Sequence, residues 1–224
     1  MDKVIISLGL AMNTTPWSVA AEYFRLFRHG TVDEEKPIGA ASVACDALVQ
    51  QHFLRTTMSQ DMSDGTMHGL EGVIQSWKFM SRCFDNIDIV PLRLENGPGG
   101  MLVANCKCNL TITENTLRLA FPQLLRGQVG SKFSSLAANI VGKILAIQGT
   151  MHLCWDAEIG RMTSVTWQVD LVKPLLELVG SIEDVSRVFN HALIAPDCSR
   201  RVLTDCELHI ASDEVVDKKN TKVR

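Results

Sequence analysis

The change of hydrophobic period that decides the fold lies within residues 69–112, GLEGVIQSWKFMSRCFDNIDIVPLRLENGPGGMLVANCKCNLTI. Apolar residues in its first part recur every three or four positions, which predicts an amphipathic helix over about 69–84. The pattern then alternates, so we expect strands at 87–95 and 102–112, joined by a hairpin turn at 96–100. A helix beside an antiparallel hairpin is therefore the central unit of the predicted fold.

Further elements are expected on both sides of this unit. Two helices are predicted upstream, the first starting at Thr15-Pro16 and ending near Gly30, and the second covering about 39–57. A turn is expected at 61–65. Downstream we expect strands at 116–121, 144–156 and 162–170, a helical turn at 134–141, and helices at 172–179 and 182–193. The fold class is α+β: one domain over 15–195 with a curved antiparallel sheet and its helices on one side, between a short tail at 1–14 and a charged tail at 196–224.

Composition limits the classes of function. The chain has 224 residues, a net charge of −3 and seven cysteines, none in a CxxC pair. This excludes a disulfide scaffold and the usual zinc fingers, and an acidic balance argues against a broad DNA-binding face. The apolar run at 4–12 is too short to span a membrane and lacks a signal-peptide cleavage site, so we expect a chain that is not secreted and has no membrane partner. Phosphate-binding and dinucleotide motifs are absent, and no cofactor or metal is expected.

Several apolar and thiol side chains are expected on the inner face, where they could line a pocket at the mouth of the sheet. Core packing would produce the same pattern, and Cys106 and Cys108, which share one face of a strand, could also form a soft-metal or redox site. The candidate pocket residues are Tyr23, Phe27, Trp77, Cys106, Cys108, Trp155 and Trp167.

Two polar constellations could carry function. If His68 faces the cavity, Asp64 could orient it as a general base; otherwise Asp64 is a turn residue and His68 bonds to backbone. On the late strands, Thr150, His152, Cys154, Thr166 and Gln168 lie opposite the helix-facing side. That polar face could pack against a second copy in a dimer, or it could be solvated. His152 and Asp156 also share a face but are too far apart along a strand for direct contact.

The chain resembles two known groups of proteins. The order of the predicted elements resembles the nuclear transport factor 2-like (SnoaL-like) superfamily, a cone in which three helices wrap a curved antiparallel sheet. Five strings resemble the domain that follows the basic leucine zipper (bZIP) in oomycete transcription factors. They are PWSVAAEYFRLFRHG at 16–30, GLEGVIQSWKFMSRCFDNIDI at 69–89, NLTITENTLRLAFPQL at 109–124, CWDAEIGRMTSV at 154–165 and LLELVGSIEDVSRVFNHALI at 175–194.

The second resemblance implies a non-catalytic regulatory domain that forms homodimers or heterodimers and acts in the nucleus, with a small apolar ligand as a further expectation. A bZIP segment needs a basic helix and heptads, which the residues before position 15 lack, so no DNA-binding residue is assigned. The chain is then either truncated or a stand-alone paralogue, the latter cytoplasmic if it is not part of a transcription factor. The alternative function is a SnoaL-like isomerase, cyclase or dehydratase that uses His68 and Asp64.

Overall fold

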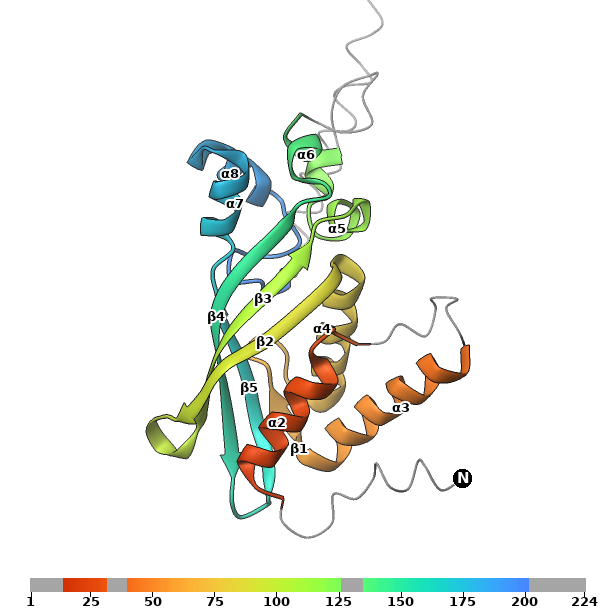
Figure 1. Cartoon of the computed structure of the whole chain (residues 1–224), viewed down its shortest axis with the longest axis vertical. Helices are drawn as coiled ribbons and strands as arrows, with labels where there is room; N and C mark the ends of the chain where they lie inside the picture. The colour runs from red at the N-terminus through yellow and green to blue at the C-terminus, as the bar shows by residue number, and fades with distance from the viewer. Residues whose placement is uncertain (1–13, 32–39, 126–134, 202–224) are drawn as a thin grey trace, which may run out of the picture.

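The computed structural model of the chain describes residues 14–31, 40–125 and 135–201, with the side chains of 40–45 excepted. Residues 1–13 and 202–224, which make up most of the two predicted tails, lie outside this description. Within it the α+β class is confirmed. Figure 1 shows a long, bent sheet with helices against one of its faces and a second group of short helices at its upper end.

The sheet has five strands in the order β1-β5-β4-β3-β2. Its antiparallel part was predicted correctly: β2 (Asp85–Asn96), β3 (Leu102–Thr111), β4 (Ile144–Asp156) and β5 (Arg161–Val169) pair as consecutive neighbours. The predicted alternation on β3 is also confirmed, since Leu102, Ala104, Cys106, Cys108 and Leu110 are all buried. A strand with one buried face fixes the register of its neighbours, because a one-residue slip would expose this whole set.

The edge strand β1 (Met58–Ser63) corrects the sequence-based expectation of a wholly antiparallel sheet. It pairs parallel with β5, so the sheet is mixed, and it occupies part of the segment expected to be a turn at 61–65. Met58 and Met62 are fully buried, whereas Gln60 and Asp61 are exposed. Two exposed polar residues between the buried ones break the alternation that identifies a strand in a sequence.

The predicted N-terminal helices are confirmed as α2 (Pro16–Phe27), α3 (Ala40–Thr57) and α4 (Leu70–Cys83). Helix α2 begins with a capping box, in which the Thr15 hydroxyl accepts from the Ser18 amide at 3.1 Å. Its apolar stripe contacts β2 and β3, and α4 contacts β1 and β2. Figure 1 shows α2 and α4 against the sheet, while α3 projects away from it.

The predicted strand at 116–121 is wrong, because these residues belong to helix α5 (Glu114–Leu119). The Thr113 side chain caps the helix, and the Thr116 hydroxyl accepts from the Thr113 amide at 2.8 Å. The short capped helix has too few residues to show a helical period. The remaining helical elements are η1 (Pro98–Gly100), η2 (Pro122–Leu125), α6 (Ser135–Ile140), α7 (Val172–Val179) and α8 (Ile182–Phe189). Helices α6, α7 and α8 confirm the helical turn predicted at 134–141 and the two C-terminal helices, although α8 ends four residues earlier than expected; η2 was not predicted.

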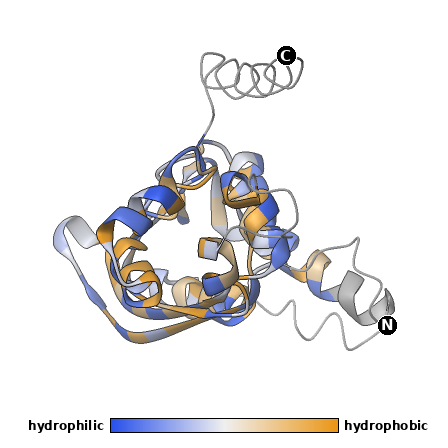
Figure 2. Cartoon of the chain, turned by 90° about the horizontal axis from the view of Figure 1, so that it is seen from above, coloured by the Kyte–Doolittle hydropathy of each residue, from blue (hydrophilic) through white to orange (hydrophobic). Residues whose placement is uncertain are grey.

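The apolar faces of these elements form one core. Seen from above, the sheet and helices form a ring in which hydrophobic segments occur on every side (Figure 2). Among the described residues, forty buried side chains drawn from both layers make up this core. Burial of this extent supplies the dominant favourable term in folding. No helix in the described part of the chain is long and apolar enough to cross a membrane.

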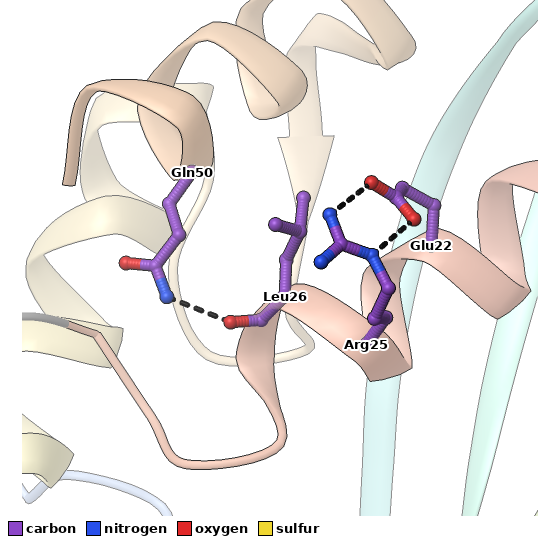
Figure 3. A network of polar contacts seen from close by, with 4 residues as sticks. All are labelled: Glu22, Arg25, Leu26 and Gln50. Atoms are coloured by element: carbon purple, nitrogen blue, oxygen red, sulfur yellow. Dashed lines mark hydrogen bonds and ion pairs between the residues drawn. The ribbon is translucent and has the colours of Figure 1, made fainter. Parts of the chain in front are cut away.

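A buried amide ties α3 to the end of α2. Figure 3 shows the Gln50 side chain reaching the Leu26 carbonyl, to which its Nε2 donates at 2.7 Å. The same nitrogen donates to the Gly30 carbonyl at 2.9 Å. Carbonyls in the last turn of a helix have no hydrogen-bond donor within that helix. The Gln50 amide supplies this donor to the Leu26 carbonyl.

Replacing Gln50 with leucine is therefore expected to lower the free energy of unfolding by about 1–2 kcal/mol, because two carbonyls lose a donor. Urea unfolding monitored by circular dichroism measures the change. Glu22→Gln is the control, since the Glu22–Arg25 pair in Figure 3 is solvent-exposed and worth at most about 0.5 kcal/mol. Equal stability of the two variants would contradict this role for Gln50.

Candidate functional site

A cavity of about 230 Å³ lies between the inner face of the sheet, α2, α4 and a turn near the end of the described chain. Its wall is mostly apolar and aromatic, with a few polar and charged groups. The lining residues are Tyr23, Asp64, Gly65, Thr66, Ser76, Trp77, Phe79, Met80, Ile87, Ile89, Cys108, Leu110, Ile147, Val165, Thr166, Trp167, Val169, Asp197, Cys198, Ser199 and Arg200. A concave, largely apolar site with few polar groups is the usual form of a small-molecule pocket.

Tyr23 and Trp77 form the hydrogen-bonded part of this wall. The Trp77 Nε1–H donates to the Tyr23 hydroxyl at 3.0 Å, which joins α2 to α4. Tyr23 also stacks on Phe27, with ring centroids 4.9 Å apart. Burial raises the pKa of Tyr23; the Trp77 hydrogen bond acts in the opposite direction, and the nearby Asp64 carboxylate adds to the increase. The phenol therefore keeps its proton at physiological pH.

The buried thiols of α4 and β3 are neutral groups. Burial raises the pKa of Cys106 to about 11 and that of Cys83 and Cys108 to about 12. Since the thiolate is the metal ligand and the nucleophile, these side chains behave as small apolar groups near pH 7. In the described ranges no group of three or more His, Cys, Asp or Glu residues could hold a metal ion.

One part of the wall was missed in the sequence. Residues 197–200, expected in the charged tail, follow a tight turn in which the Cys198 amide donates to the Ala195 carbonyl at 2.9 Å. The Leu171 amide donates to the Pro196 carbonyl at 2.8 Å and attaches this turn to the start of α7. The Arg200 guanidinium lies 4.8 Å from the centre of the Phe79 ring. Pro196-Asp197 followed by Ser199 is a turn signal that could have identified this segment.

The structure brings some of the predicted pocket residues together and separates others. Tyr23, Trp77, Cys108 and Trp167 line the cavity. Phe27, Cys106 and Trp155 are not among its lining residues. Phe27 is buried behind Tyr23, Cys106 is buried on β3, and Trp155 is half-buried near the end of β4.

The structure does not assemble the predicted His68–Asp64 pair at the cavity. Asp64 lines the cavity, but its Oδ1 accepts from the amides of Thr66 at 2.9 Å and Met67 at 2.7 Å, as an aspartate in a turn does. His68 is exposed, pairs through its backbone with Ser63, and is not among the residues that line this cavity. The structure therefore places Asp64 at the cavity and His68 outside its lining.

The predicted dimer residues share the outer face of β4 and β5. Thr150 is paired with Gln168, and His152 with Thr166, in the antiparallel register. Thr150, His152 and Cys154 are half-buried, and Gln168 is exposed. Thr166 also contributes to the cavity wall, beside Gly65 at the sheet edge.

Residues 17–83 match a known family, described as the bZIP transcription factor 1 C-terminal domain. The match covers less than a third of the chain and includes most of the first two strings on which the resemblance was based. No curated protein matches the chain. The resemblance to the domain that follows the bZIP segment is thereby confirmed over these residues.

The similar solved structures include SnoaL-like proteins from bacteria. One from Jannaschia sp. CCS1, described as a SnoaL-like polyketide cyclase, has 12% identity and a TM-score of 0.47, with 76% of this chain and 96% of that chain covered. IdmH from Streptomyces antibioticus, described as a polyketide cyclase, has 13% identity and a TM-score of 0.45, with 75% and 99% covered. Residues 17–83 are therefore similar to a domain that is associated with transcription factors of the bZIP type.

Proposed function

We propose that this protein is a non-catalytic regulatory domain of the bZIP transcription-factor type, which pairs with a second copy through its outer sheet face and binds a small apolar ligand in its cavity. The observation that carries the proposal is the family match of residues 17–83. The proposal includes a nuclear location, which the same match supports. The net charge of −3 supports a role in which this domain does not itself hold duplex DNA, because DNA binding depends largely on phosphate neutralisation.

The outer face of the sheet has the properties of a surface that a second copy could cover. The register brings Asn105 of β3, Thr150 of β4 and Gln168 of β5 into one row, and Val103, His152 and Thr166 into the next. These side chains carry no formal charge when His152 is neutral, and the charged Arg93 and Glu95 on β2 pair with each other at 2.8 Å. Lys107 of β3, which pairs with Gln148, adds an exposed positive charge beside these rows. Two such faces related by a two-fold axis could therefore pack through the two neutral rows.

The ligand part of the proposal rests on the cavity. Its volume of about 230 Å³ exceeds the roughly 150 Å³ of an engineered apolar cavity that binds benzene. Trp77, Phe79 and Trp167 supply aromatic surface, and the neutral Cys108 thiol adds no charge. Such a wall favours an apolar molecule over a phosphorylated or highly charged one.

The dimer is tested by size-exclusion chromatography with light scattering at about 100 μM, well above the Kd of a typical weak dimer. The wild-type chain is expected to have the mass of two copies. His152→Asp places a carboxylate on the outer face of each copy and is expected to weaken the dimer at least about tenfold, because burying like charges together is costly. His191→Asp is the matched control, since His191 is exposed in the turn after α8 and aspartate tolerates its positive φ of 59°.

Circular dichroism establishes that both variants are folded. A wild-type monomer at this concentration, or a His152→Asp dimer as stable as that of His191→Asp, would refute pairing through the outer face.

A further inference from the structure

We infer that the cavity selects an uncharged apolar molecule with a neutral acceptor oxygen, such as that of a carbonyl group, which accepts a hydrogen bond from the Tyr23 hydroxyl. This inference rests on the ligand-binding part of the proposed function and specifies the chemical class of the ligand. It is drawn from the hydrogen-bonding groups at the wall, the charges around them and the size of the space.

Within the described part of the chain, the Tyr23 hydroxyl accepts a hydrogen bond but donates none. Tyr23 is 3% exposed, and its oxygen accepts the Trp77 Nε1–H at 3.0 Å. A phenol can also donate one hydrogen bond, and among the contacts recorded for the described residues no acceptor receives that hydrogen. A buried donor without an acceptor costs free energy, which a ligand oxygen at the same position would recover. Tyr23 and Trp77 both line the cavity, so a ligand bound there lies against these two side chains.

The electrostatic surroundings keep the Tyr23 hydroxyl a donor. Burial raises the pKa of the phenol, and the Asp64 carboxylate raises it further, so the hydroxyl is protonated throughout the physiological range. The same carboxylate disfavours an anionic ligand near Tyr23. A cation would gain from Asp64 but offers no lone pair to the hydroxyl. A neutral acceptor is the class that satisfies the donor without opposing the carboxylate.

The other charged groups at the wall do not change this conclusion. Asp64 and Asp197 each use Oδ1 to accept from the turn that contains them. Arg200 is exposed and lies over the Phe79 ring. The remaining surface, which includes Ile147, Val165 and Trp167, fits the apolar body of a molecule with one or two rings.

The test compares two probes of nearly the same shape, acetophenone and α-methylstyrene. α-Methylstyrene has a methylene group in the position of the carbonyl oxygen of acetophenone. Their dissociation constants are measured on the full chain by calorimetry. Wild-type protein is expected to bind acetophenone about tenfold more tightly, because only the ketone can accept from Tyr23. The double variant Tyr23→Phe with Trp77→Phe removes both donors, so its preference for the ketone should disappear or reverse.

Single variants separate the two donors. Trp77→Phe keeps the Tyr23 hydroxyl and should retain the preference; its loss in this variant would contradict Tyr23 as the donor. Tyr23→Phe removes the acceptor of the Trp77 N–H, which could then donate to the ketone in place of Tyr23. The double variant is decisive because it removes both donors. Binding of α-methylstyrene by each variant shows that its cavity is intact.

The outcomes distinguish this inference from the proposed function. If wild-type protein binds both probes equally, or if the double variant keeps the preference, the carbonyl specificity is wrong while apolar ligand binding stands. If wild-type protein binds neither probe at millimolar concentration, both the carbonyl specificity and the ligand-binding part of the proposed function are wrong.

Discussion

Replacing Phe27 with alanine is expected to lower the free energy of unfolding by about 3–5 kcal/mol, the range for removing a fully buried aromatic ring. Phe27 is 1% exposed and lies where the three N-terminal helices meet. Its ring centre is 4.9 Å from that of Tyr23 on α2, 5.3 Å from that of Trp77 on α4 and 6.4 Å from that of Phe53 on α3. Alanine would leave a cavity at this junction, and domains of this size are stable by only about 5–15 kcal/mol.

Denaturant unfolding followed by tryptophan fluorescence measures the effect, since Trp77 reports on this junction. Phe27→Leu is the control: it keeps most of the buried volume and should cost clearly less, about 1–1.5 kcal/mol. If alanine and leucine destabilise equally, the ring contacts of Phe27 do not hold the helices together.

Replacing Thr116 with valine is expected to cost about 2–3 kcal/mol, although valine has nearly the same shape. Thr116 is fully buried, and its hydroxyl donates to the Cys83 carbonyl at the end of α4. The same oxygen accepts from the Thr113 amide at 2.8 Å. Valine would leave a carbonyl and an amide without this partner, and a buried backbone group that loses its hydrogen bond bears the full cost of desolvation.

Thermal unfolding of the valine and serine variants tests this prediction. Thr116→Ser keeps the hydroxyl, loses one methyl group and should cost about 1 kcal/mol. A valine variant as stable as the serine variant would show that the hydroxyl contributes little.

The sequence predicted the elements whose hydrophobic pattern is long and regular. Helices α2 and α4 and strands β3 and β4 each bury a periodic set of side chains, and that set is visible in the sequence. The two errors concern short segments. Strand β1 has polar Gln60 and Asp61 between its buried methionines, and α5 has only six residues, too few to show its period.

The candidate site was predictable in part for the same reason. Tyr23, Trp77, Cys108 and Trp167 face inward on regular elements, and all four line the cavity. The turn at 197–200 could not be placed there, because its position depends on the bond between the Leu171 amide and the Pro196 carbonyl, which joins segments separated along the chain. The position of His68 outside the cavity depends likewise on how the loop after β1 closes against the sheet.

The sequence alone determined the α+β class, the inner and outer faces of the long strands, and the resemblance to the domain that follows a bZIP segment. These features are carried by local period and by contiguous strings, which require no knowledge of distant contacts. Only the tertiary structure decided that β1 pairs parallel with β5, that Phe27 stacks on Tyr23 instead of lining the cavity, and that the Tyr23 hydroxyl accepts from Trp77. Each of these depends on contacts between segments far apart in the chain, which form when the helices pack on the sheet.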